Sequence, residues 1–187
     1  HPCDVLFLCL PHGHAMEHID RFRELAPRII DLSGDFRLKT SADYQQWYNV
    51  EHPRPHLLEE FVYGIPELHR EEMKNARLIS SAGCNATSVI LGLYPLYREG
   101  IVEPSQTVVE VKAGTSQGGN SINPGSHHPE RSGAIRAYKP AGHRHTAEML
   151  QELSFGKEIN IHFSATSINM VRGIHCVAHV FLTQDMD

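Results

Sequence analysis

Residues 4–32 read DVLFLCLPHGHAMEHIDRFRELAPRIIDL, and this stretch decides the fold of the first part of the chain. The apolar run over 4–10 is typical of a buried strand, and a Pro-His-Gly turn ends it. Over 14–26 the apolar side chains recur at spacings of four and three, which predicts a helix with one buried face. Residues 28–32 predict a second strand. Strand, helix and strand with short links predict a β-α-β unit with parallel strands.

The remainder of the chain changes character near residue 80. Residues 35–75 predict a long excursion over the sheet, with one short helix. The further elements expected by pattern are strands over 76–80, 107–112, 159–168 and 173–183, and helices over 41–49 and 143–153. A helix of about 13 residues that ends at Glu99 is expected after Asn85, and a long loop over 113–142. The fold expected is an α/β Rossmann-type portion, a partial nucleotide-binding domain over 1–80. An α+β catalytic and dimerisation domain with a mainly antiparallel or mixed sheet is expected over 81–187.

Composition excludes several functional classes. The 187 residues carry a net charge of −5, which argues against general nucleic-acid binding. No apolar run reaches the ~18 residues of a membrane span, and no signal peptide is visible. The four cysteines form no C-x-x-C pair and suit a reducing, cytoplasmic compartment. Because the sequence opens within a strand and without methionine, we expect a central portion of a longer protein.

Cys84 stands where a predicted strand gives way to a helix, between Gly83 and Asn85. A helix N-terminus carries unpaired N–H groups and partial positive charge, which stabilise a thiolate and can hold an oxyanion. Gly83 leaves room for a substrate, and Asn85 can cap the helix or donate a hydrogen bond. Most lone cysteines are buried filler, but a polar, glycine-flanked junction favours a nucleophile.

Two histidines open a later helix within the segment Gly142-His143-Arg144-His145. A cysteine nucleophile needs a group that takes and returns a proton, and histidine does both near neutral pH. We expect one of them at the active site, with a slight preference for His145 over His143. The alternative is that both are ordinary helix-start residues. The H-x-H pairs lack a third and fourth ligand at telling spacing, so no metal site is expected.

The predicted long loop carries further candidates. The run from Lys112 to Gly119 is rich in glycine, and its N–H groups can face a phosphate or a nicotinamide amide. Arg131, Arg136 and Arg172 can hold a phosphate or a carboxylate, although each alone is as well explained as a solvated surface residue.

With these residues identified, the chain resembles the N-acetyl-gamma-glutamyl-phosphate reductase family. It looks closest to the branch that acts on carrier-protein-linked aminoadipyl or glutamyl phosphate in lysine and arginine biosynthesis. The motifs that carry the resemblance are Leu10-Pro11-His12-Gly13, Asp31-Leu32-Ser33-Gly34-Asp35-Phe36-Arg37-Leu38, Gly83-Cys84-Asn85-Ala86-Thr87, Gly142-His143-Arg144-His145-Thr146-Ala147-Glu148 and Met170-Val171-Arg172-Gly173-Ile174.

The resemblance implies an NADP-dependent oxidoreductase that forms the semialdehyde through a thioester on Cys84, and a homo-oligomer, either a dimer or a tetramer. It places Pro11, His12, Gly13, Ser116 and Gly118 at the cofactor. A substrate site is expected from Asn85 and from the three arginines, Arg131, Arg136 and Arg172.

Two departures bear on the substrate. Acetylglutamyl-phosphate reductases usually carry Ser-Gly-x-Gly-Arg where this chain has Ser116-Gln117-Gly118-Gly119-Asn120, and the segment 126–136 resembles the carrier-dependent branch. A carrier-linked acyl phosphate is therefore favoured over the N-acetyl compound. The alternatives are an enzyme like aspartate-semialdehyde dehydrogenase, against which the His-Arg-His segment speaks, and a non-catalytic oligomerisation fragment.

Overall fold

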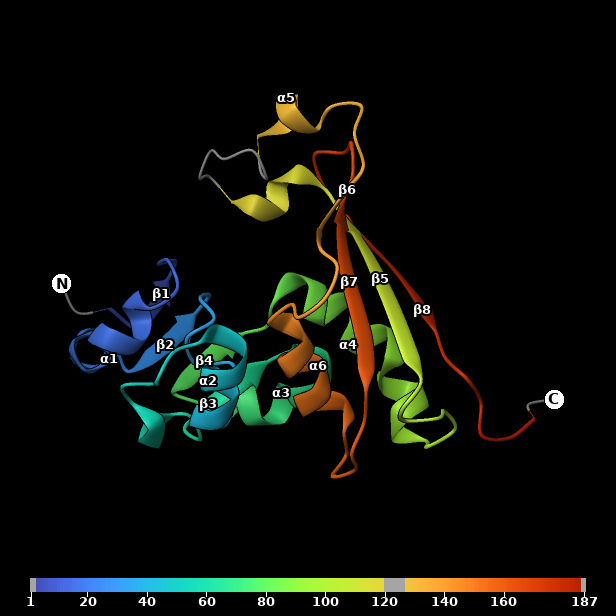
Figure 1. Ribbon diagram of the computed structural model, residues 1–187. Coiled ribbons are helices and arrows are strands. Elements are labelled where there is room, and N and C mark those ends of the chain that lie inside the picture. Colours follow the sequence, from blue (N-terminus) through green and yellow to red (C-terminus); the bar gives the residue numbers. More distant parts are fainter. Residues whose placement is uncertain (1–2, 120–126, 186–187) are drawn as a thin grey trace. The chain divides into compact units, whose positions relative to one another are not determined.

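The computed structural model describes residues 3–119 and 127–185, so Asn120 and Ser126 of the motifs above lie outside the described residues (Figure 1). The chain divides into two compact units, His1–Gly83 and Cys84–Asp187. This division falls close to the boundary predicted between residues 80 and 81. Each unit is described by itself below.

The first unit contains one sheet of four strands in the order β1-β2-β4-β3, and every neighbouring pair is parallel. The predicted β-α-β unit and its parallel strands are confirmed. The elements are β1 (Val5–Leu8), α1 (His14–Leu25), β2 (Arg28–Asp31), α2 (Ser41–Tyr48), a 3₁₀ turn (Pro55–Leu57), β3 (Phe61–Gly64), α3 (Pro66–Asn75) and β4 (Leu78–Ser81).

Two elements of this unit were not predicted. β3 occupies an edge of the sheet and has only four residues, too few for a clear alternation. α3 contains no buried residue, so it lacks the apolar stripe from which a helix is recognised. The stretch 35–75 is therefore partly sheet and helix, and the prediction of an excursion with a single helix was incomplete.

The segment that follows β2 fixes the carboxyl edge of this sheet. Its Asp35 carboxylate accepts hydrogen bonds from Gly13 N (2.8 Å) and Met16 N (3.0 Å), which caps the first turn of α1. The buried Arg37 donates from Nε to Ser81 O (2.8 Å) and from Nη2 to Leu32 O (3.1 Å). These bonds join the ends of strands that are far apart in sequence.

Asp31, at the end of β2, makes the stability of the chain depend on pH. The side chain is fully buried, and burial raises its pKa from 3.8 to about 6 despite its hydrogen bonds with Ser33. The folded state then binds the proton more tightly than the unfolded state. The contribution of Asp31 to the free energy of unfolding is fully present below pH 3.8 and is lost as the pH rises through about 6.

We therefore expect Asp31→Asn to have a free energy of unfolding roughly 3 kcal/mol larger than that of the parent at pH 8, and one that matches the parent near pH 4. Urea unfolding at the two pH values measures this. Asp4→Asn, at an exposed aspartate, is the control and should show no such difference. An equal gain at both pH values would contradict the titration of Asp31 as the cause.

The second unit contains a mixed sheet in the order β6-β7-β5-β8, with β5 parallel to β7 and the other two pairs antiparallel. The mixed sheet was one of the two predicted forms. The elements are α4 (Cys84–Arg98), β5 (Thr107–Ala113), a 3₁₀ turn (Thr115–Gly118), α5 (His128–Arg131), β6 (Arg136–Lys139), α6 (His145–Leu153), β7 (Ile161–Ser167) and β8 (Ile174–His179). The stretch 113–142, predicted as loop, thus contributes one edge strand and a short helix.

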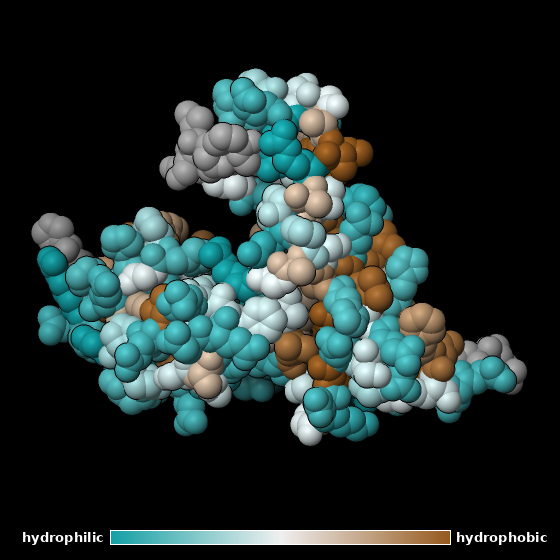
Figure 2. Space-filling view, in the orientation of Figure 1, coloured by the Kyte–Doolittle hydropathy of each residue, from teal (hydrophilic) through white to brown (hydrophobic). Residues whose placement is uncertain are grey.

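Helices α4 and α6 pack against each other, α4 contacts β8, and α6 contacts β7. Alternate residues of β5 point into this core, as Val109 and Val111 are fully buried. Val108, on the opposite face, is 46% exposed, and Figure 2 shows apolar residues gathered over these strands. The sheet therefore has one covered face and one face open to solvent. No helix in the described part of the chain is long and apolar enough to cross a membrane.

Candidate active site

Cys84 is the first residue of α4, and its thiol is exposed and free. Its Sγ lies 3.9 Å from Asn85 Oδ1, a weak hydrogen bond with the thiol as donor. The Asn85 side chain is only 1% exposed. The predicted nucleophile thus lies at a helix N-terminus, with a buried amide held beside it.

Tyr138 on β6 connects this cysteine region to the turn after β5. Its hydroxyl accepts a hydrogen bond from Asn85 Nδ2 (3.1 Å) and donates one to Gln117 Oε1 (3.0 Å). Burial raises the pKa of the phenol, so the ring stays protonated at neutral pH. The sequence analysis did not predict Tyr138 or Gln117 as site residues, because neither stands in a position that marks it as functional.

The two predicted histidines lie together at the start of α6. Their ring centroids are 4.5 Å apart, and His143 also packs edge-on against Tyr138. The His145 ring is 6% exposed, and its Nε2 lies 3.8 Å from Oε1 of the fully buried Glu148. This pair becomes an ion pair when His145 is protonated. The spacing of three residues on one helix brings the carboxylate and the ring together.

The His143 ring is uncharged near neutral pH. Burial, the charge of His145 and that of Arg144 lower the pKa of His143 from 6.5 to about 3. Its Nδ1 accepts a hydrogen bond from His145 N (3.1 Å), so the neutral ring carries its hydrogen on Nε2. His143 can donate a hydrogen bond near neutral pH, but it does not exchange a proton there.

The three predicted arginines have different surroundings. Arg131 is only 2% exposed, and its Nε and Nη1 have no hydrogen-bond partner within residues 3–119 and 127–185. Burial and the nearby charge of Arg136 lower the pKa of Arg131, while the Tyr138 phenol opposes this. Arg136 and Arg172 are exposed. Of the three, Arg131 is the buried cation whose desolvation an anion would compensate.

The predicted cofactor residues Ser116 and Gly118 are exposed on the 3₁₀ turn after β5. Backbone hydrogen bonds hold this turn against the segment 170–173, from Gly114 N to Gly173 O (2.9 Å) and from Ser116 N to Val171 O (2.9 Å). A Cβ on Gly114 would lie 2.8 Å from Val171 O, so only glycine permits this approach.

The other predicted cofactor residues, Pro11, His12 and Gly13, lie in the first unit, between β1 and α1. The backbone of Gly13 has a φ of 93°, in the left-handed region, and caps α1. His12 Nδ1 accepts a hydrogen bond from Gly34 N (2.7 Å), while the side chains of Pro11 and His12 are exposed.

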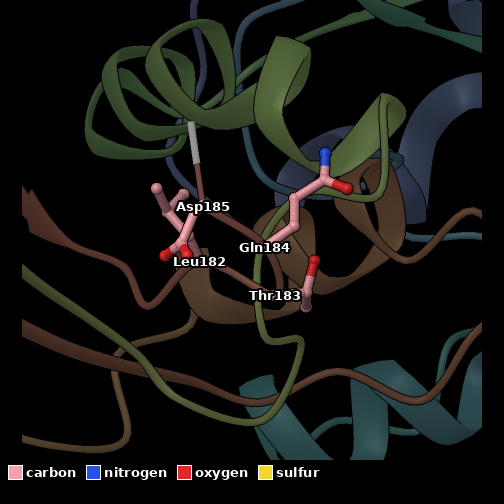
Figure 3. A pocket seen from close by; sticks show the side chains of 4 residues that line it. All are labelled: Leu182, Thr183, Gln184 and Asp185. Atoms are coloured by element: carbon pink, nitrogen blue, oxygen red, sulfur yellow. The ribbon is translucent and has the colours of Figure 1, made fainter. Parts of the chain in front are cut away.

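A separate open hollow is lined by the C-terminal residues Leu182, Thr183, Gln184 and Asp185 (Figure 3). None of the predicted site residues lines it. Within the described residues no three His, Cys, Asp or Glu side chains gather as a metal site would require.

Family comparison identifies both units. Residues 84–187 match the semialdehyde dehydrogenase dimerisation domain, and residues 1–76 match the semialdehyde dehydrogenase NAD binding domain. The chain therefore belongs to the semialdehyde dehydrogenase family, a family of oxidoreductases.

The curated relatives of this chain belong to the branch that the sequence motifs resemble, the reductases of carrier-linked aminoadipyl or glutamyl phosphate. The LysW-L-2-aminoadipate/LysW-L-glutamate phosphate reductase of Saccharolobus solfataricus is 47% identical over 186 residues, which are 98% of this chain and 53% of that protein. A protein of Thermomicrobium roseum, provisionally named a LysW-L-2-aminoadipate 6-phosphate reductase, is 56% identical over 187 residues, 99% of this chain and 53% of its own length. The chain thus spans about half the length of these relatives.

Solved structures of aspartate-semialdehyde dehydrogenases share the fold. Enzyme II of Vibrio cholerae superposes with a TM-score of 0.68 at 14% identity, covering 98% of this chain and 57% of that one. The Candida albicans enzyme with NADP gives a TM-score of 0.64 at 12% identity, covering 99% and 52%. At these identities the likeness concerns the fold alone.

Proposed function

We propose that the protein of which this chain is a part reduces an amino-acid acyl phosphate to the semialdehyde, with NADPH as reductant and a thioester on Cys84. The observation that carries the proposal is the exposed Cys84 thiol at the start of α4, in the same unit as the adjacent pair His143 and His145. The substrate proposed is aminoadipyl or glutamyl phosphate linked to a carrier protein. The sequence relatives named for LysW-linked substrates favour it over N-acetyl-gamma-glutamyl phosphate.

In the first half-reaction the Cys84 thiolate attacks the acyl carbon. The carbon–oxygen bond to phosphate breaks, inorganic phosphate leaves with the bonding electron pair, and a thioester remains. Backbone N–H groups in the first turn of α4 face the place where the oxyanion develops. The amide of Asn85, held beside the sulfur, belongs to the same wall of the site.

A nicotinamide cofactor, when held by the residues proposed below, would supply the hydride that reduces the thioester carbon. His145 donates a proton to the resulting oxyanion and takes it back as the carbon–sulfur bond breaks, which releases the aldehyde and restores the thiolate. Its neighbour Glu148 stabilises the protonated ring. Neutral His143 serves as a hydrogen-bond donor through Nε2, since its Nδ1 is engaged by His145 N.

The cofactor contacts are proposed for Pro11, His12 and Gly13 in the first unit and for Ser116 and Gly118 in the second. The N–H groups of Gly13 and Met16 already bond the Asp35 carboxylate, so the first turn of α1 offers no phosphate site. The exposed side chains of Pro11 and His12 suit the uncharged nicotinamide amide better than a phosphate.

The anionic part of the substrate is proposed to bind Arg131, with Arg136 and Arg172 as further contacts. Arg131 is buried, and its Nε and Nη1 have no hydrogen-bond partner among the described residues, which supports this assignment because an anion beside the guanidinium would compensate its desolvation. A homo-oligomer is proposed through residues 84–187, on the match to a dimerisation domain. The four free cysteines support a reducing, cytoplasmic compartment.

Trapping the acyl-enzyme tests the proposal. The full-length protein is mixed with LysW-linked aminoadipyl phosphate without NADPH, and the Cys84 peptide is analysed by mass spectrometry. We expect an acyl adduct that hydroxylamine removes, formed faster than with free N-acetyl-gamma-glutamyl phosphate. No adduct from either compound, with normal oligomer formation, would favour the non-catalytic oligomerisation module. An adduct from aspartyl phosphate alone would favour the aspartate-semialdehyde dehydrogenase alternative.

A further inference from the structure

Tyr138 links two amide side chains but has no role in the chemistry proposed above. Its hydroxyl contacts Asn85, at the start of α4, and Gln117, on the 3₁₀ turn after β5. Asn85 in turn contacts the Cys84 sulfur. One phenol therefore connects the proposed nucleophile to a loop distant from it in sequence.

The chemistry of the three groups fixes the direction of these hydrogen bonds. An amide nitrogen only donates and an amide oxygen only accepts, while a protonated phenol can do both. The phenol of Tyr138 accepts from Asn85 Nδ2 and donates to Gln117 Oε1. The Asn85 oxygen must then face Cys84 Sγ, where it accepts from the thiol and opposes a thiolate.

We propose that Tyr138 is a positioning residue that holds the Asn85 amide with its oxygen toward Cys84 and so favours the protonated thiol in the absence of substrate. The proposal rests on the proposed function of Cys84 for its significance. The geometry on which it depends, however, is independent of turnover.

Removing the phenol oxygen frees the amide to turn. Asn85 is 1% exposed, and without Tyr138 Oη its Nδ2 would be a buried donor with no acceptor among the described residues, which is unfavourable. Turning the amide over brings Nδ2 to the position that Oδ1 now occupies, 3.9 Å from the sulfur. In that orientation the amide donates to a thiolate and stabilises it.

Other charged groups near Tyr138 remain in place when the hydroxyl is removed. Arg131 is such a group, since its charge acts on the phenol, and so is Cys84 itself, while the His143 ring that packs against Tyr138 stays neutral. A change at Cys84 on replacing tyrosine by phenylalanine is therefore assigned to the amide only where it vanishes in the absence of the Asn85 side chain.

The test measures iodoacetamide alkylation of Cys84 against pH in the full-length protein, read by mass spectrometry. We expect Tyr138→Phe to move the pH midpoint of alkylation down by about one unit, the size of one hydrogen bond to a charged group. Tyr94→Phe, the same change at a half-buried tyrosine on α4, should leave it unchanged.

Asn85→Ala supplies the second arm. In that background Tyr138→Phe should have no effect on the midpoint, because the amide through which it acts is gone. An unchanged or raised midpoint in Tyr138→Phe, or an equal shift in the Asn85→Ala background, would overturn the proposal. Alkylation is measurable whether or not Cys84 forms a thioester, so failure here is distinct from failure of the trapping experiment.

Discussion

The Cys84→Ser variant of the full-length protein is expected to fold like the parent and to lose reductase turnover by about three orders of magnitude or more. A serine hydroxyl stays protonated near neutral pH, and the start of α4 can stabilise a thiolate far more readily than an alkoxide. Because Cys84 is exposed and makes only a weak 3.9 Å contact with Asn85, its replacement removes little packing. Turnover at saturating substrate, with thermal unfolding as the fold check, measures the effect.

Cys3→Ser is the matched control, since Cys3 is also exposed and free. It should keep both turnover and stability. Alkylation of the parent protein across pH provides an independent reading, in which Cys84 should react ahead of Cys3, Cys9 and Cys176, because the start of α4 stabilises its thiolate more strongly than the Asn85 oxygen opposes it. Near-normal turnover of Cys84→Ser would refute the thioester mechanism.

The second large effect is expected at His145. We expect His145→Gln to lower kcat by about two to four orders of magnitude, because the variant loses the group proposed to protonate the oxyanion formed on the thioester carbon. The companion variant His143→Gln should lower it much less. The His143 ring is neutral near pH 7, and glutamine can replace its hydrogen-bond donor.

The pH–rate profile separates the two histidines more sharply than the rates do. The limb that reports the acid–base group should persist in His143→Gln, since the pKa of His143 is lowered to about 3 by burial, and it should disappear in His145→Gln. If the limb disappeared in His143→Gln instead, the roles assigned to the two rings would be exchanged.

The spacing of apolar residues in the sequence was sufficient to predict the helices that bury an apolar face. α1 and α4 were predicted within a few residues because their apolar side chains repeat at helical spacing. β3 and β6 were missed because both are four-residue edge strands, held by pairing with distant segments rather than by their own pattern. α3 was missed because it buries no side chain.

The candidate site shows the same division between local and distant information. Cys84, His143 and His145 each stand at a helix start, which the sequence reveals. Tyr138 lies 53 residues from Asn85 and 21 residues from Gln117, and the single hydroxyl that joins the two amides leaves no periodic signal in the sequence. The sequence also gives no means of ranking the arginines, because only the burial of Arg131 in the folded chain distinguishes it from the exposed Arg172.

The close approach at Gly114 joins the turn after β5 to the segment 170–173, which lies far from it in the sequence. The antiparallel pairing of β5 and β8 continues beyond the strands as Gly114 N to Gly173 O and Ser116 N to Val171 O. Any residue with a Cβ at position 114 would therefore have to push the segment 170–173 away from the turn that carries Ser116, because the added atom would lie 2.8 Å from Val171 O. The separation between the loop of Ser116 and the loop of Arg172 thus depends on the missing side chain of a single residue.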